Sequence, residues 1–542
     1  MKILAPAWFS KSVFYEVYPQ SFCDTNADGI GDLEGIISKL DYIKNLGCNA
    51  IWLNPIFVSP FKDAGYDVAD YLQVAPRYGT NEDLYRLFAV AHEKGLHVIL
   101  DLVPGHTSDQ HEWFLQSAQP YTNEYTNRYI WTNTTWSAPK GFRCISGKFD
   151  RNGNYLVNFF STQPALNYGF AHCEESWQLP ISHPDCLETK EALKSIIRFW
   201  LDKGCDGFRV DMADSLVKKD IHNKATMEIW REVRTMLNKN YPEAVLISEW
   251  SNPRKALACG FHADFYLDHP DNGYRALLRR KDPATDEALG YFKKTGPGDI
   301  EFFVEDYLPR YEAAKGKGYV SFITGNHDTA RLRRTYELEE LKLAYAFLFT
   351  MPGVPFLYYG DEIGMRFVEG LTSKEGGYDR TGSRTPMQWQ QGLNYGFSTA
   401  PEGKLYTKMD ASPDAPTVED QAKDPTSLLN VVKQVLKVRQ ENLDLQAGGA
   451  FSVLYVRNRA AAIVEEEQSV KSFSILHKQE EAYPFIYQRG GTLIAVNPSG
   501  LSASAPINML GTILFSLGAL PERTEEEITM APQSFVVVRP GA

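Results

Sequence analysis

The chain has 542 residues, of which 43% are hydrophobic and 13% aromatic, so it can bury a large core and form two or three domains. A formal net charge of −12 excludes the basic face that nucleic acid or an anionic membrane requires, and a neutral small-molecule substrate fits better. No stretch resembles a transmembrane span or a secretory signal peptide. We therefore predict a cytoplasmic protein with no nucleic-acid or membrane partner.

The seven cysteines are an odd number and contain no C-x-x-C pair. This spacing is typical neither of a disulfide framework nor of a zinc site. We interpret most of them as small buried apolar residues. A nucleophilic cysteine is disfavoured because none stands in a motif with a nearby histidine.

Helical and β-rich segments alternate along the first three quarters of the chain. Helical patterns end at glycines, as at Gly47, Gly95 and Gly204, and Thr80 with Asp83 resembles a capping box. The predicted strands are 13–19, 49–55, 97–103, 207–212, 245–250, 263–268, 319–324 and 354–359. Strands that alternate with amphipathic helices predict a parallel sheet, here an α/β fold closed into a (β/α)8 TIM barrel.

Two regions depart from this alternation. Roughly a hundred residues separate the strand ending at Val103 from the one starting at Gly207, far more than one helix and its loops need. A helix over about 426–445 is followed by short strands and turns. We predict the barrel in two parts, 1–105 and 168–447, an inserted domain over 106–167 after the third strand, and a C-terminal antiparallel β domain over 448–542.

Charged residues close four of the apolar runs. The four segments are 101–106 (Asp101 to His106), 207–211 (Gly207 to Asp211), 247–249 (Ile247 to Glu249) and 325–328 (Gly325 to Asp328). The carboxyl-terminal ends of barrel strands meet at one face, where (β/α)8 enzymes keep their chemistry. A single Asp or His at a strand end is more often a cap or loop hydrogen bond, but the ordered set favours a functional site.

These four segments resemble the four short sequence regions of the α-amylase family of retaining glycoside hydrolases, glycoside hydrolase family 13. Residues 163–167 are similar to the family's additional region near the end of its inserted domain. Residues 65–67 and 384–389 resemble the oligo-1,6-glucosidase and trehalose-synthase-like branch. The resemblance runs from about Val13 to Trp389, and beyond that it is only architectural.

Retaining hydrolysis needs two carboxyl groups about 5 Å apart, one ionised and one protonated. Asp211 follows Arg209 by two, so on a strand both side chains point the same way and the guanidinium keeps the carboxylate ionised. Glu249 follows a largely apolar run, and a drier setting keeps a carboxyl protonated. The resemblance implies Asp211 as nucleophile and Glu249 as general acid and base.

The resemblance also implies residues that bind the sugar. Asp328 resembles the family's third carboxylate, which binds the 2- and 3-hydroxyls, and His106 and His327 match its two hydrogen-bonding histidines. Tyr66 resembles its stacking platform. Phe160 is a candidate second aromatic wall, with apolar packing as the open alternative.

Two further positions concern the end of the substrate. Asp63 and Arg384 match residues that grip the terminal sugar's 4-hydroxyl in the oligo-1,6-glucosidase branch, which implies a buried ion pair closing the site. The alternative is a surface Asp and an Arg that pairs elsewhere, with Arg380 as another partner. Asp101 is expected to support the site by hydrogen bonding.

The segment from Asp24 to Asp32 carries hard oxygen donors at alternating positions, with glycines that permit a sharp turn. Gly35 stands where an EF-hand would supply its bidentate Glu, so that interpretation fails. The loop resembles the first βα-loop metal site of oligo-1,6-glucosidases, which implies a structural Ca²⁺. The expected ligands are Asp24, Asn26, Asp28, Ile30 and Asp32.

A solvated loop of Asx turns without metal is the alternative at this segment. A second family calcium site uses an Asn where this chain has Gly105, which offers no ligand.

The leading interpretation is a retaining α-glucosidase that acts on short oligosaccharides from the non-reducing end. Its rival is a glucosyl-transferring or isomerising enzyme of the trehalose-synthase type. A non-catalytic homologue, such as an amino-acid transporter heavy chain, is disfavoured because all three carboxylates are present and a membrane anchor is not found. The natural sugar, the linkage and the oligomeric state stay open, and Met212, at a position that influences linkage, is neither common family choice.

Overall fold

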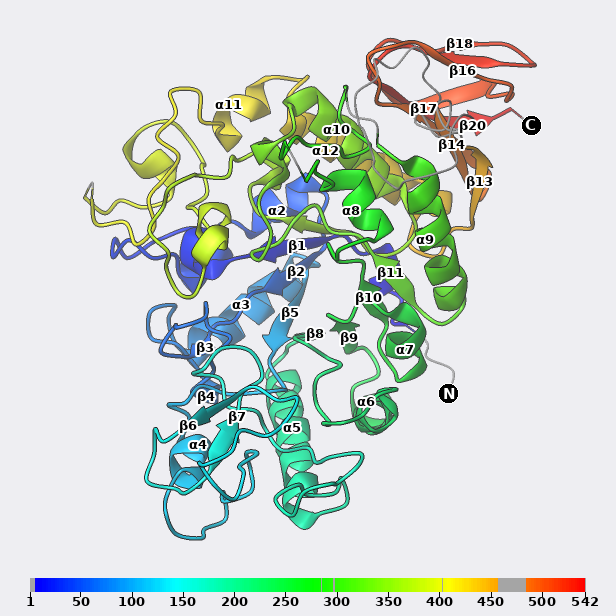
Figure 1. The fold of residues 1–542 in the computed structure, drawn as a ribbon. Helices are drawn as coiled ribbons and strands as arrows, with labels where there is room; N and C mark the ends of the chain where they lie inside the picture. The colour runs from blue at the N-terminus through cyan, green and yellow to red at the C-terminus, as the bar shows by residue number, and fades with distance from the viewer. Residues whose placement is uncertain (1–4, 284, 296–297, 402, 457–483, 542) are drawn as a thin grey trace.

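The computed structural model describes residues 5–283, 285–295, 298–401, 403–456 and 484–541 (Figure 1). Its centre is an eight-stranded parallel sheet in the order β11-β10-β9-β8-β5-β2-β1-β12. A parallel bridge between Ile323 and Phe356 joins the end of β11 to β12 and closes the sheet. The predicted (β/α)8 barrel is confirmed. Its strands are β1 (Phe14–Val17), β2 (Ala50–Leu53), β5 (His97–Leu102), β8 (Gly207–Val210), β9 (Val245–Ser248), β10 (Ala263–Phe265), β11 (Tyr319–Ser321) and β12 (Phe356–Tyr358).

Helices follow each barrel strand along the chain. They are α1 (Leu33–Ser38), α2 (Leu40–Leu46), α3 (Asn81–Glu93), α5 (Pro184–Asp202), α6 (Lys224–Asn240), α7 (Pro253–Ala258), α8 (Gly273–Leu278), α9 (Ile300–Ala314), α10 (Leu338–Thr350) and α12 (Leu428–Glu441). The predicted capping box of Thr80 and Asp83 starts α3. Gly47 ends α2 with φ of 105°, a conformation that favours glycine.

The strand residues of the barrel are almost all buried, and large aromatic side chains fill the core. Trp52 on β2, Trp200 on α5 and Trp230 on α6 are among the largest fully buried side chains. Because apolar burial drives folding in proportion to area, this core fixes the positions of the strand ends.

A long segment between β5 and β8 lies apart from the barrel, at the bottom of Figure 1. It contains α4 (Glu112–Ser117) and the antiparallel pair β6 (Cys144–Ser146) and β7 (Asn154–Leu156). A second antiparallel pair, β3 (Phe57–Val58) and β4 (Asp70–Val74), extends the loop after β2. This is the inserted element expected after the third barrel strand, and its limits at 106 and 167 stay predictions.

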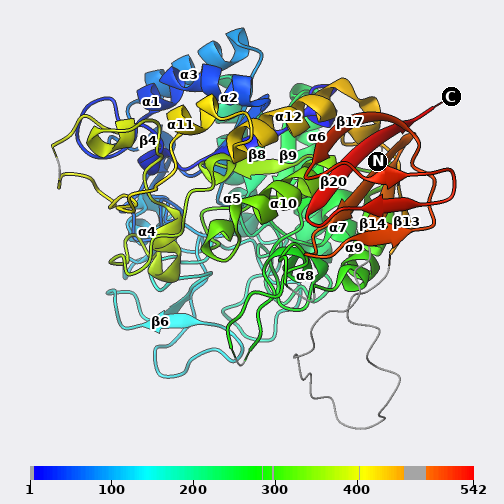
Figure 2. The same cartoon turned by 90° about the horizontal axis from the view of Figure 1, so that it is seen from above.

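The C-terminal part is antiparallel, as predicted. One sheet has the order β13-β14-β15-β20-β17 and a smaller one β16-β19-β18. Seen from above, the larger sheet lies beside α12, and short α11 (Val418–Lys423) precedes that helix (Figure 2). The hydroxyls of Thr350 on α10 and Tyr487 on β14 are 2.6 Å apart, which ties the sheet to the barrel. The strands are β13 (Phe451–Tyr455), β14 (Phe485–Arg489), β15 (Thr492–Asn497), β16 (Ala503–Ala505), β17 (Gly511–Leu517), β18 (Glu522–Arg523), β19 (Ile528–Met530) and β20 (Ser534–Pro540).

Within the described residues, no helix combines the length and the apolar character needed to cross a bilayer. All seven cysteines are free thiols, and five of them are buried, as the sequence predicts. The two others, Cys144 and Cys173, are half-buried and exposed.

Candidate active site

The charged residues predicted from the sequence meet at the carboxyl end of the barrel. Asp211 directly follows β8, Glu249 directly follows β9, and Asp328 lies in the loop after β11. Asp101 on β5 is in register with Arg209 on β8. Parallel strands of a closed barrel end at one face, so residues far apart in sequence become neighbours.

Arg209 joins three carboxylates. Its Nη1 lies 2.8 Å from Asp101 Oδ1 and 2.9 Å from Asp211 Oδ1, and its Nη2 lies 2.7 Å from Glu249 Oε1. The guanidinium side chain is only 1% exposed. We call these four residues the single-arginine cluster. With every group ionised, three negative charges face one positive charge.

Burial and a neighbouring charge favour protonation of Asp211. Burial raises the pKa of the Asp211 carboxyl well above its ordinary value, and the charge of Glu249 raises it further, while Arg209 opposes both. Burial also raises the pKa of Asp101 against the effect of Arg209. Arg209 was expected to keep Asp211 ionised, but burial and the charge of Glu249 oppose that effect. Asp211 therefore binds a proton more readily than an exposed aspartate does, and it must give up that proton before it can act as a nucleophile.

Glu249 does not occupy the drier position, so that expectation is wrong. Its side chain is 20% exposed, against 11% for Asp211. The apolar run belongs to the body of β9, whereas Glu249 lies one residue beyond the strand end, where solvent reaches it. Its Oε2 accepts a hydrogen bond of 3.0 Å from the backbone N–H of Met212, whose φ of 40° is unusual for a residue other than glycine.

A second charged cluster lies on the other side of Asp328. Arg384 Nη2 is 3.0 Å from Asp328 Oδ1, and Arg380 contacts the same oxygen. Arg380 Nη2 lies 3.7 Å from Asp63 Oδ1, and Gln163 donates a 2.8 Å hydrogen bond to Asp63 Oδ2. We call Asp63, Asp328, Arg380 and Arg384 the two-arginine cluster.

The predicted ion pair between Asp63 and Arg384 is therefore corrected. Asp63 pairs with Arg380, and Arg384 pairs with Asp328 and donates from Nε to the His327 carbonyl at 2.8 Å. Arg380 lies within the 3-10 helix η5 (Tyr378–Ser383) and reaches both Asp63 and Asp328, while Arg384 lies one residue beyond the helix and reaches Asp328.

The two carboxylates of this cluster differ in acidity. Removal from water raises the pKa of Asp328, but His327 and the two arginines outweigh it and hold the pKa well below its usual value. For Asp63, burial raises the pKa to about 6, against the hydrogen bond from Gln163. Asp328 is thus a fixed negative charge, whereas Asp63 changes charge in mildly acidic solution.

His327 is held between two carboxylates. Its Nδ1 is 2.9 Å from Glu16 Oε1 on β1, and its Nε2 is 3.0 Å from Asp328 Oδ2. The Tyr66 ring stacks on the imidazole at 5.2 Å between centroids, and its hydroxyl donates to Asp101 at 2.9 Å. Burial lowers the pKa of His327, but Asp328 and Glu16 prevail and raise the pKa to about 9. His327 is therefore an imidazolium at neutral pH.

His106, unlike His327, is a neutral imidazole at neutral pH. Burial lowers its pKa to about 4. Its Nε2 lies 3.2 Å from the Tyr66 carbonyl oxygen, which can only accept, so Nε2 carries the proton. Its Nδ1 faces the Asn158 amide at 3.3 Å. To donate a hydrogen bond to a sugar, as expected, His106 must first break its hydrogen bond to the Tyr66 carbonyl oxygen.

Phe160 lies half-buried beside the two-arginine cluster. Its ring centroid is 6.2 Å from that of the exposed Tyr378, and its backbone N–H donates to the Gln163 side chain that also binds Asp63. This places an aromatic surface next to Asp63, in keeping with either predicted role, a sugar wall or packing.

The predicted calcium loop is stabilised by its own hydrogen bonds. Asp24 accepts from the N–H groups of Asn26, Ala27 and Gly29 at 3.0, 2.8 and 2.8 Å, and Asp32 caps α1 through the Gly35 N–H. The donor chemistry suits Ca²⁺. The carboxylates do not converge: among the described residues, the loop's carboxylate oxygens are not a group lying within 4.8 Å of one another. The expected set also includes oxygens of Asn26 and Ile30, and backbone N–H bonds of this kind leave carboxylate oxygens free to bind an ion, so the calcium site stays a prediction.

Gly105 lies close to two polar side chains at the position expected to lack a calcium ligand. A Cβ at this position would lie 2.7 Å from Asn158 Nδ2 and 2.9 Å from Ser215 Oγ. Lys218 Nζ, 3.2 Å from Asn158 Oδ1, supplies a cation next to the same amide.

Three residues that contact the site were not among the predicted catalytic and sugar-binding residues. Glu16, Gln163 and Met212 contact His327, Asp63 and Glu249 respectively. Gln163 opens a recognised motif and Met212 follows the nucleophile position, so proximity in sequence could have indicated both. Glu16 sits inside an apolar strand, and only the closed barrel brings it to His327.

The chain resembles proteins of known family over most of its length. A family profile described as "Alpha amylase, catalytic domain" matches residues 16–448. The trehalose synthase/amylase TreS of Mycolicibacterium smegmatis is 34% identical over 498 residues, covering 82% of this chain and 78% of that protein. The oligo-1,6-glucosidase of Parageobacillus thermoglucosidasius is 28% identical over 509 residues, covering 82% of this chain and 86% of that protein.

Solved structures agree in fold. A mutant isomaltulose synthase from Erwinia rhapontici NX5, determined in complex with D-glucose, superposes with a TM-score of 0.78 at 23% identity and covers 100% of both chains. Chain organisation is therefore shared from the first barrel strand to the C-terminal β domain.

Proposed function

Since the chain belongs to the α-amylase family of glycoside hydrolases, we propose that it is a retaining α-glucosidase that removes single glucosyl units from the non-reducing end of short α-glucosides. The observation that carries the proposal is the pairing of two carboxyl groups, Asp211 and Glu249, on one buried guanidinium. That arrangement suits a double displacement at an anomeric carbon.

In the first step Asp211 attacks the anomeric carbon while the bond to the leaving oxygen breaks. Glu249 gives its proton to that oxygen, and the product is a glucosyl ester on Asp211. In the second step Glu249 removes a proton from an incoming hydroxyl, which attacks the same carbon and releases Asp211. Two inversions restore the α configuration.

The two-arginine cluster supports cleavage at a chain end. We propose that Asp328 binds the 2- and 3-hydroxyls and that Asp63, paired with Arg380, binds the 4-hydroxyl of the terminal glucose. A longer chain continuing from the 4-oxygen would leave buried charged groups without partners, a cost of several kcal/mol. Starch should therefore lose iodine staining slowly relative to glucose release, and an early fall in staining would contradict this role.

A transferring reaction is the second candidate. The relative with 34% identity is named trehalose synthase/amylase, and the fold neighbour is an isomaltulose synthase. Both reactions share the glucosyl-Asp211 step and differ only in whether water or a sugar hydroxyl accepts the glucosyl group. The contacts of the protein's own residues favour neither acceptor.

Product analysis separates the two. Purified enzyme is incubated with maltose and the products are followed by NMR, which also reports the anomer first released. Glucose alone supports the hydrolase, whereas trehalose or longer sugars support transfer. The Asp211→Asn protein is the matched control for contaminating activity. Retention is read from 4-nitrophenyl α-D-glucoside, whose glucose comes only from the cleaved bond, and first release of β-glucose from it would overturn retention for either candidate.

We also propose that the segment from Asp24 to Asp32 binds Ca²⁺. The support is chemical: carboxylate, amide and carbonyl oxygens at alternating positions of a tight turn. The ion would stabilise the loop after β1 and supply no catalytic group.

A further inference from the structure

The amino end of the barrel, opposite to the catalytic carboxylates, carries an unexpected group of side chains. His92 lies in the last turn of α3, His97 is the first residue of β5, and Asp206 immediately precedes β8. Asp211 leaves the carboxyl end of that same strand β8. The group therefore belongs to the other face of the sheet from the proposed reaction.

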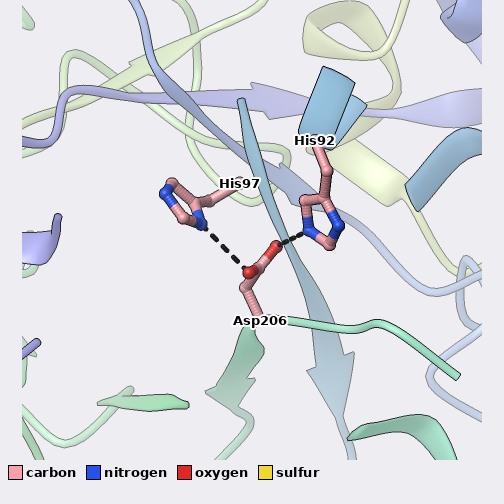
Figure 3. A group of neighbouring side chains, drawn as sticks. All are labelled: His92, His97 and Asp206. Carbon is pink, nitrogen blue, oxygen red and sulfur yellow. Dashed lines mark hydrogen bonds and ion pairs between the residues drawn. The ribbon is translucent and has the colours of Figure 1, made fainter. Parts of the chain in front are cut away.

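The three side chains point toward one another (Figure 3). His92 Nε2 is 2.8 Å from Asp206 Oδ2, and His97 Nδ1 is 3.0 Å from Asp206 Oδ1. Among the described residues, this is the one group of three or more His, Cys, Asp or Glu whose potential ligand atoms all lie within 4.8 Å of one another.

We propose that His92, His97 and Asp206 bind a divalent transition-metal ion of the zinc class. Imidazole nitrogens with one carboxylate are a donor set that suits such ions and not Ca²⁺ or Mg²⁺. Ligand atoms about 2.1 Å from a tetrahedral ion are about 3.4 Å apart, so the contacts of 2.8 and 3.0 Å to Asp206 need to lengthen by only about half an ångström for an ion to enter.

Neighbouring groups hold two of the three ligands in place. The Trp8 ring stacks on the His97 imidazole at 3.9 Å between centroids and 14° between planes. The Val98 N–H donates a 2.7 Å hydrogen bond to Asp206 Oδ2. Ligands fixed in this way lose little freedom when an ion binds.

The site is open to solvent on one side. The side chains of His92, His97 and Asp206 are 40%, 26% and 16% exposed. An ion can therefore enter and complete its coordination with water. Bound there, it would link the end of α3 to β5 and to the entry of β8, and it would act on stability and not on the sugar chemistry.

The test is calorimetric titration with ZnCl₂. Every protein carries Cys173→Ser, because Cys173 is the exposed thiol and a competing zinc ligand. His92→Gln removes one ligand from an exposed helix position without emptying the core, and His222→Gln, at another exposed histidine, is the matched control. We expect one site of micromolar or tighter affinity in the parent and in His222→Gln, and binding at least about 10-fold weaker in His92→Gln.

Anomalous diffraction from zinc-soaked crystals of the parent locates the ion independently of any variant. A peak between the three side chains supports the site. Equal zinc binding by His92→Gln and the parent, or no peak at this position, would show that the group is only a hydrogen-bonded cluster and would overturn the proposal. Neither result depends on the proposed glucosidase activity.

Discussion

The two charged clusters at the carboxyl end of the barrel contain the same residue types in different balance. The single-arginine cluster sets three carboxylates against Arg209 alone. The two-arginine cluster sets Asp63 and Asp328 against two guanidinium groups. In the first, the pKa of Asp211 is raised by burial and by Glu249; in the second, His327 and the arginines hold the pKa of Asp328 well below its usual value.

Charge balance thus separates chemistry from recognition within a single site. A surplus of carboxylates leaves a proton to be exchanged, which acid catalysis and nucleophilic attack both need. In the two-arginine cluster His327 and the arginines keep Asp328 charged, and Asp63, with a pKa of about 6, is mostly charged at neutral pH, which suits binding of hydroxyl groups. Changes to the first cluster should therefore abolish turnover, whereas changes to the second should alter which substrate is accepted.

The largest effect is expected for Asp211→Asn, which should lower kcat by at least about 10,000-fold because no covalent intermediate forms. The protein should stay folded. The pKa of Asp211 is raised in the folded state, so its effect on stability is favourable at low pH and is lost as the pH rises through that pKa. At pH 7 the amide should therefore equal or exceed the parent in Tm.

Steady-state kinetics and thermal melting check this prediction. Asp150→Asn makes the same chemical change at an exposed position and should behave as the parent. Activity of Asp211→Asn within about tenfold of the parent would exclude Asp211 as the nucleophile.

Glu249→Gln should give the next largest loss, and its size should depend on the leaving group. We expect about 1,000-fold on maltose, whose leaving oxygen needs a proton, and far less on aryl glucosides with acidic phenols. The ratio of the two kcat/KM values is the measurement. Equal losses on both substrates would contradict the assignment of Glu249 as the acid.

Asp63→Asn tests recognition. Loss of a charged hydrogen bond should lower kcat/KM for maltose by about 30-fold. Maltose without the 4-hydroxyl on its non-reducing glucose should be a poor substrate for the parent but should be no worse than maltose for Asp63→Asn. Arg86→Lys, at a surface ion pair, is the control. A full penalty for the deoxy substrate in Asp63→Asn would show that Asp63 does not bind that hydroxyl.

Glu16→Gln tests whether Glu16 maintains the positive charge of His327. The pKa of this histidine lies at about 9, above its ordinary value of 6.5. Its stabilising contribution is therefore complete below about pH 6.5 and is lost as the pH rises through about 9. Replacing Glu16 by a neutral amide should move this alkaline loss to lower pH and reduce kcat/KM by about tenfold.

Melting temperatures from pH 6 to 10 follow that change, with Glu93→Gln as an exposed control. An unchanged alkaline midpoint in Glu16→Gln would mean that Glu16 does not set the charge of His327.

The smallest effect concerns calcium. Complete chelation should lower Tm by a few degrees while leaving kcat within about twofold, because the loop from Asp24 to Asp32 contributes no group to either cluster. Asp28→Asn, at an exposed ligand position, should lose the calcium response. An unchanged Tm after metal removal, with elemental analysis showing none bound beforehand, would favour the metal-free Asx-turn loop.

The barrel and its insertion could be predicted because local patterns determine them. All eight predicted strands contain an observed one, and helix ends such as Gly47 are set by residues within a single turn. The three carboxylates were predictable for the same reason, since each follows a strand. The solvent exposure of Glu249 could not be predicted, because an apolar run describes the strand and not the residue that follows it.

Ion pairs between residues far apart in the chain were harder to predict from the sequence. Asp63 and its partner Arg380 are separated by more than three hundred residues, and two arginines four positions apart compete for it. Glu16 and His327 are likewise joined only by closure of the barrel. The group of His92, His97 and Asp206 comes from three separate elements, so no local motif marks it.

The most direct test of the division between the clusters is to trap the glucosyl enzyme. A 5-fluoro-α-D-glucosyl fluoride slows the second step and leaves the sugar on the nucleophile, and mass spectrometry of a proteolytic digest identifies the labelled residue. We predict one fluoroglucosyl group per chain, on Asp211, with the two-arginine cluster unlabelled. Labelling of Glu249 or Asp328, or inactivation without any covalent label, would contradict the assignment of the chemistry to the single-arginine cluster.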